Sequence, residues 1–139
     1  MNTTPPLVAF VGRAHMLHEA LADALDEIAE VRFLPAGRPD PVGLLTWLRP
    51  DAIVVDDVEE RDRLEPFARA TDTPLLVIGG GSGGVVLFEH GEWTALAGVT
   101  ARAESLRNIV VPRLFKRRDD PGGTVATERV VGGVPGRDA

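Results

Sequence analysis

The sequence predicts a single α/β domain in which a mostly parallel β-sheet lies between two layers of helices. Short apolar runs alternate with amphipathic segments of helical periodicity along most of the 139 residues. The runs are uninterrupted by polar residues, which is typical of strands that are buried on both faces. Strands and helices that alternate in this way imply right-handed crossovers between parallel strands, and hence a doubly wound three-layer sandwich.

The first strand and helix are predicted by a change in the spacing of apolar residues along the sequence. Leu7–Val11 is a continuous apolar run that follows Pro5-Pro6 and ends at Gly12. In the segment His15–Ala29, apolar residues recur at helical spacing and acidic residues occupy the other side. This segment is therefore predicted to be an amphipathic helix that packs on the sheet.

The same alternation follows in the next two units. Val31–Leu34 is a short predicted strand, and Pro41–Leu48 is a short predicted helix that ends before Pro50. Ala52–Val55 is the clearest strand, because it is apolar, mostly β-branched and uninterrupted.

Two carboxylates follow that strand directly. Asp56 and Asp57 are therefore expected at the carboxyl edge of the sheet, where ligands of open α/β sheets usually bind. Arg61–Thr71 is predicted to be the next helix, and Pro74–Ile78 a fourth buried strand.

After the fourth strand the pattern changes. Gly79–Gly84 is too rich in glycine to hold a helix, and Val85–Phe88 and Trp93–Ala97 are predicted to form a strand, a turn and a second strand. A glycine-rich loop and a hairpin thus replace the helix expected here.

Trp47 and Trp93 are assigned to the core by default.

A final helix is predicted from about residue 101 to 111, with Thr100 as its N-cap and Pro112 at its end. It carries more apolar surface than a one-sided helix needs, which predicts a homodimer or partner interface. The interface candidates are Leu106, Ile109, Val110, Leu114 and Phe115. Residues 1–118 are the predicted domain, and residues 119–139 a disordered tail or linker.

Composition limits the possible functions. The formal net charge is −6 with a pI near 5.0, and Lys116–Arg118 is only a weak basic patch, so direct nucleic-acid binding is not expected. The absence of cysteine excludes disulfides, thiolate catalysis and redox function. No run approaches the ~20 apolar residues that cross a bilayer. We therefore expect a soluble cytoplasmic protein without membrane contact.

Two stretches resemble the receiver domains of LuxR-type response regulators. Val11–Leu21 reads Val-Gly-Arg-Ala-His-Met-Leu-His-Glu-Ala-Leu, where the family usually has Val-Asp-Asp-His-Pro-Leu-Val-Arg-Glu-Gly-Leu. Pro50–Asp56 is similar to the Pro-Asp-Val-Val-Leu-Leu-Asp segment that ends in the phosphoacceptor. The resemblance covers about residues 7–111 and implies a flavodoxin-like, CheY-like fold with five strands in the order 2-1-3-4-5.

The resemblance also implies a phosphotransfer site, and this sequence departs from it. Asp56 takes the phosphoacceptor position, but Gly12 and Arg13 stand where an acidic pair would hold Mg²⁺. Gly79 stands at the Thr or Ser position that binds the phosphoryl group, and the Lys position falls near Ala97. The implied domain is a degenerate receiver with no catalytic residues, metal or cofactor. We expect Arg13 and Asp56 to interact directly as an ion pair that mimics a locked state.

The function expected from these departures is phosphorylation-independent regulation by protein–protein contact in bacterial signalling or transcription control. One alternative is a working phosphoacceptor at Asp56, with an unusual metal site next to Asp57, Glu59 and Glu60. The second is a small-molecule or nucleotide site at the Gly79–Gly84 loop, which formally matches a glycine fingerprint. An enzyme is not expected, because no nucleophile with an activating partner can be placed.

Overall fold

The fold is described from a computed structural model of the chain, which describes residues 5–13, 15–79, 84–99 and 102–119, excluding the side chains of residues 15 and 115–119. The strands and helices in chain order are β1 (Leu7–Gly12), α1 (His15–Ala24), β2 (Glu30–Pro35), α2 (Pro41–Leu48), β3 (Ala52–Val55), α3 (Val58–Thr71), β4 (Leu75–Gly79), β5 (Gly84–Glu89), β6 (Glu92–Leu96) and α4 (Ala103–Asp119). The predicted α/β class is confirmed, and so is the hairpin that follows β4, which β5 and β6 form.

The sheet has six strands in the order β2-β1-β3-β4-β5-β6, not five. The first four pair in parallel, whereas β5 is antiparallel to β4 and β6 is antiparallel to β5. The reason lies in chain length. Only residues 80–83 separate β4 from β5, and a parallel pairing needs a crossover of about a dozen residues or more. The chain therefore has to turn back along β4.

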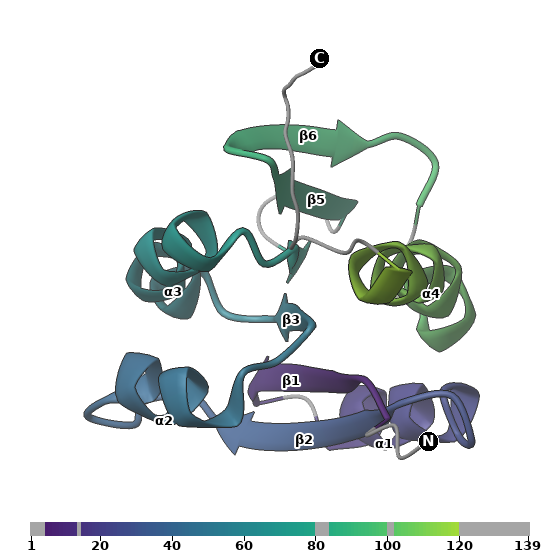
Figure 1. Ribbon diagram of the computed structural model, residues 1–139, viewed down its shortest axis with the longest axis horizontal. Coiled ribbons are helices and arrows are strands. Elements are labelled where there is room, and N and C mark those ends of the chain that lie inside the picture. The colour runs from purple at the N-terminus through teal and green to yellow at the C-terminus, as the bar shows by residue number, and fades with distance from the viewer. Residues whose placement is uncertain (1–4, 14, 80–83, 100–101, 120–139) are drawn as a thin grey trace.

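Two helices cover each face of the sheet (Figure 1). α2 and α3 lie on one face, and α1 and α4 lie on the other. Each side has its own apolar core, one built around Phe10, Leu21 and Leu106 and the other around Leu45, Leu64 and Phe88. All four residues of β3 are fully buried, which agrees with a central strand between two helical layers.

Two helices end at other residues than the sequence predicts. α1 stops at Ala24, and the chain then turns through Glu27, whose φ of 69° is left-handed although it is not glycine. α4 passes through Pro112 and continues to Asp119. Leu114, beyond the proline, is fully buried in the core, and Arg113 donates a hydrogen bond from its side chain to the Ile109 carbonyl at 2.7 Å.

Tertiary packing thus carries α4 past the residue that was predicted to end it. The predicted tail, residues 119–139, lies outside the described residues except for Asp119, which is the last residue of α4.

Candidate functional site

The candidate site lies at the carboxyl ends of β1 and β3. These strands pair in parallel, with Val11 beside Val55, so the residues that follow each strand meet at one edge of the sheet. Asp56 follows β3, and Arg13 follows β1. The Asp56 amide donates to the Val11 carbonyl at 3.2 Å, which extends the pairing by one residue.

The Asp56 carboxylate is held by the backbone of the neighbouring strand. The Arg13 amide donates to Asp56 Oδ1 at 3.0 Å and to Oδ2 at 3.2 Å. A Cβ at Gly12 would lie 1.8 Å from Asp56 Oδ1 and 2.4 Å from its carboxyl carbon. Glycine at position 12 therefore creates the space that the carboxylate occupies, and an acidic residue there is incompatible with this position of Asp56.

The expected ion pair between Arg13 and Asp56 was wrong: the contact with Asp56 is made by the Arg13 backbone amide. The guanidinium of Arg13 instead donates from Nε to Asp57 Oδ2 at 3.1 Å. The Arg13 side chain is 72% exposed, so solvent screens this ion pair and it contributes little to stability. This ion pair places the positive charge of Arg13 beside the carboxylate of Asp57.

Asp57 caps α3. Its Oδ1 accepts hydrogen bonds from the amides of Glu59 at 2.9 Å and Glu60 at 3.4 Å, which explains why α3 begins at Val58 rather than at the predicted Arg61. Desolvation alone would raise the pKa of Asp57, but the hydrogen bonds from Arg13 and from these two amides outweigh it and hold the pKa below its ordinary value.

Glu60 is a site residue whose role the sequence did not reveal, since it was considered only as one of the acidic residues next to Asp57. Glu60 is 3% exposed, and its Oε2 accepts from the Gly37 amide and from Arg63 Nη1, both at 3.0 Å. Its Oε1 is buried and has no hydrogen-bond partner among the residues that the structure describes. Arg63 also donates to the Arg38 carbonyl at 2.7 Å. Glu60 and Arg63 therefore tie the loop after β2 to α3, at the same edge of the sheet.

No group of three or more histidine, aspartate and glutamate side chains that could hold a metal ion is found within residues 5–13, 15–79, 84–99 and 102–119. The alternative of a metal-assisted phosphoacceptor thus has no assembled ligand set in the described part of the chain.

Of the two predicted switch positions, the structure places only Gly79 at the same edge of the sheet as Asp56, on the neighbouring strand. Gly79 ends β4, next to β3, but Ala97 follows β6 and is exposed. Because β5 lies between β4 and β6, Ala97 belongs to the third strand from β3, or about 14 Å away at the usual strand spacing. In the predicted order the fifth strand would lie next to β4. The inserted antiparallel strand is the physical reason for the difference.

The alternative of a small-molecule or nucleotide site at the Gly79–Gly84 loop can be compared with the structure only in part. Residues 80–83 lie outside the described residues, and the segment that follows them is the strand β5, which begins at Gly84. A phosphate-binding glycine loop normally leads into a helix N-terminus, whose amides and dipole attract the anion. This loop leads into a strand, so it lacks that source of affinity.

Three of the five interface candidates on α4 belong to the core. Leu106, Val110 and Leu114 are each fully buried against the sheet and α1, and Ile109 is partly buried beside them. The side chain of Phe115 lies outside the described residues. The apolar surface that the sequence assigned to an interface is thus used within the domain, because α4 closes one face of the sheet.

A large exposed apolar side chain lies elsewhere, on α2. Trp47 is 76% exposed, so its assignment to the core was wrong. Trp93 is partly buried, with its ring 4.9 Å from that of Phe88. Trp47 is therefore an aromatic side chain that is available for contact with another molecule.

Comparison with known proteins adds support for the fold alone. No protein-family model matches the chain, and no curated protein matches it. A crystal structure of a multiply substituted variant of HypX from Aquifex aeolicus is similar, with a TM-score of 0.52 and 15% sequence identity. The match covers 84% of this chain and 28% of the HypX chain, so this chain spans less than a third of that protein's length.

No helix within the described residues is long and apolar enough to cross a membrane. The class of protein that the fold and the comparison define is an α/β three-layer domain with a mixed sheet.

Proposed function

We propose that this chain is a receiver-like regulatory domain that acts by binding a protein partner, without phosphorylation. The observation that carries the proposal is the position of Asp56, whose two carboxylate oxygens both accept the Arg13 amide. The resemblance of Pro50–Asp56 to receiver domains supplies the setting, which is bacterial signalling or transcription control in the cytoplasm.

The chemical requirements of phosphoryl transfer support a function that is independent of phosphorylation. Transfer to a carboxylate needs an accessible oxygen and a divalent cation that neutralises the developing charge. Here Gly12 supplies no ligand, and the Arg13 guanidinium stands beside Asp57, 3.1 Å from its Oδ2. A guanidinium at this place repels a divalent cation and already neutralises part of the acidic charge.

The same contacts suggest one constant conformation of this edge. The link from Arg13 to Asp56 and Asp57 joins the end of β1 to the start of α3, and Glu60 joins α3 to Gly37 in the loop after β2. These contacts need neither a phosphoryl group nor a metal. A domain held in this way is suited to constitutive binding rather than to switching.

For the partner surface we propose the outer side of α2, because Trp47 is exposed there while Leu106, Val110 and Leu114 of α4 are buried. Tryptophan is among the residues most enriched at binding hot spots. The first partner to test is a second copy of this chain.

Light scattering during size-exclusion chromatography of the full chain, with and without Mg²⁺ and acetyl phosphate, tests the proposal. We expect a dimer whose mass does not depend on the donor and which Trp47→Ala converts to a monomer. A monomer at all concentrations would contradict the self-association, and assembly only in the presence of the donor would contradict the proposed function.

A further inference from the structure

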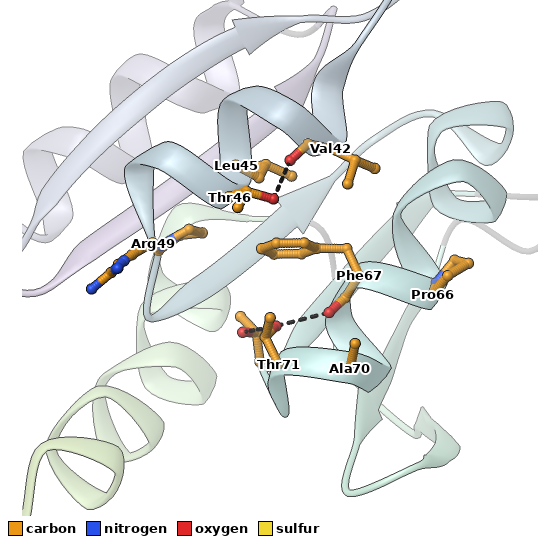
Figure 2. A pocket seen from close by; sticks show the side chains of 10 residues that line it. Val42, Leu45, Thr46, Arg49, Pro66, Phe67, Ala70 and Thr71 are labelled. Carbon is orange, nitrogen blue, oxygen red and sulfur yellow. Dashed lines mark hydrogen bonds between the residues drawn. The ribbon is translucent and has the colours of Figure 1, made fainter.

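A groove of about 660 Å³ lies between α2 and α3, on the face opposite to α1 and α4. Figure 2 shows the Phe67 ring between the two helices, with Arg49 at one side of the groove and Pro66 at the other. The lining residues are Val42, Leu45, Thr46, Arg49, Pro50, Pro66, Phe67, Ala70, Thr71 and Thr73. The volume falls within the range of about 300–1,000 Å³ that is typical of small-molecule sites.

The groove is separate from the site at Asp56. It is bordered by Pro50 and Thr73, which precede β3 and β4, so it lies toward the amino ends of these strands. Helix α3 runs from beside Asp57 to Thr71, a distance of about 20 Å at the normal helical rise. A ligand in the groove would therefore not compete with the contacts of Arg13.

The threonine hydroxyls that line the groove have already committed their protons. Thr46 donates to the Val42 carbonyl at 2.7 Å, and Thr71 donates to the Phe67 carbonyl at 2.8 Å. The hydroxyls of Thr71 and Thr73 lie 2.7 Å apart, and since the proton of Thr71 is used, Thr73 is the donor in this pair. These hydroxyls therefore provide a ligand with no hydrogen-bond donor.

Arg49 is the one charged residue among those that line the groove. It follows α2 as its C-cap, with a left-handed φ of 54°, and its side chain is exposed. Within the described part of the chain, its guanidinium makes no hydrogen bond or ion pair. In Figure 2 it extends outward from the edge of the groove, where a bound anion could meet it at the surface.

We propose that this groove binds a small monocarboxylate with an apolar body. The apolar body would lie against Phe67, Pro66 and Ala70, and the carboxylate would pair with Arg49, whose planar guanidinium matches a carboxylate in two parallel hydrogen bonds. A single cation fits one anionic group, whereas a nucleotide brings several phosphates and needs more donors than the lining provides. The proposal does not depend on the function proposed above.

Octanoate is a suitable probe, with octylammonium and 1-octanol as the cationic and neutral compounds of the same chain length. Titration of the ¹⁵N-labelled full chain, followed by NMR, should give saturable shifts for octanoate at residues of α2 and α3 that line the groove. We expect octanol to bind more weakly and octylammonium to bind least. Absence of saturable shifts with octanoate, or equal affinity for the three compounds, would overturn the proposal.

Variants separate the role of the charge from that of the groove. Arg49→Gln should weaken octanoate binding about two- to fivefold, because it removes an ion pair at an exposed position, and it should leave octanol unchanged. Arg49→Lys should retain most of the affinity. Ala70→Trp, at an exposed helical position, should fill the groove and weaken both compounds.

Arg102→Gln is the matched control, because Arg102 is exposed and precedes α4 on the opposite face. It should change nothing. If Arg49→Gln and Arg102→Gln weakened octanoate equally, the effect would be one of net charge, and the assigned role of Arg49 would be wrong.

Discussion

Replacement of Gly12 by alanine tests the geometry at Asp56. The added methyl carbon would lie 1.8 Å from Asp56 Oδ1, so the carboxylate has to move away from the Arg13 amide. Loss of a hydrogen bond to a charged group at this exposed position should cost about 1–2 kcal/mol. For a domain of this size we expect a fall in Tm of roughly 4–8 °C, measured by circular dichroism.

A double-mutant cycle separates the clash from a general effect of alanine on β1. In an Asp56→Ala background the obstructing carboxylate is gone, and Gly12→Ala should be neutral or slightly stabilising, because alanine loses less backbone entropy on folding than glycine. The reasoning is refuted if Gly12→Ala costs the same free energy of unfolding in both backgrounds, since the cost would then have no connection with Asp56.

Three further predictions concern neighbouring residues. Asp57→Ala should lower the free energy of unfolding by about 1 kcal/mol at pH 7, because the cap of α3 is lost. The pKa of Asp57 is lowered in the folded state from 3.8, so the wild type keeps this advantage above about pH 4 and loses it as the pH falls through the lowered pKa. Denaturation curves of the two proteins should therefore converge in acid. Glu60→Ala should lower the free energy of unfolding by about 1–3 kcal/mol in chemical denaturation, because it removes the acceptor of the Gly37 and Arg63 hydrogen bonds. A cost below 0.5 kcal/mol, roughly the effect of an ordinary surface change, would contradict the role of Glu60 in joining α3 to the loop after β2. At a concentration at which the wild type is monomeric, Trp47→Ala should change the free energy of unfolding by less than about 0.5 kcal/mol, because the side chain is exposed. A larger loss under these conditions would mean that the indole packs within the domain.

The sequence predicted the parts of the fold that depend on local pattern. Ala52–Val55 is fully buried as expected, because a β-branched run of this kind is stable only between two helical layers. The place of Asp56 at the carboxyl edge follows directly from the end of that strand. Both predictions needed only the period and the type of a few consecutive residues.

What the sequence did not predict depends on contacts between distant residues. That Leu114 lies in the core, and that α4 therefore continues through Pro112, became visible only when α4 was packed against the sheet. The burial of Glu60 depends on Gly37, which is 23 positions away in the chain. Sequence periodicity does not report such pairings.

The resemblance to receiver domains gave the correct strand order as far as β4, but it placed the wrong strand next to β4. The four residues that separate β4 from β5 were recognised as too rich in glycine for a helix, and their number also excludes a parallel crossover. Counting them would have predicted an antiparallel β5. It would also have separated Ala97 from Asp56 before the structure was known.

The intact mass of the full chain after incubation with acetyl phosphate and Mg²⁺ tests the central claim most directly. Because the Arg13 amide holds both oxygens of Asp56 and its guanidinium stands beside Asp57, we predict no added phosphoryl group. A stoichiometric phosphoryl mass that Asp56→Ala abolishes would contradict the account and make Asp56 a working phosphoacceptor.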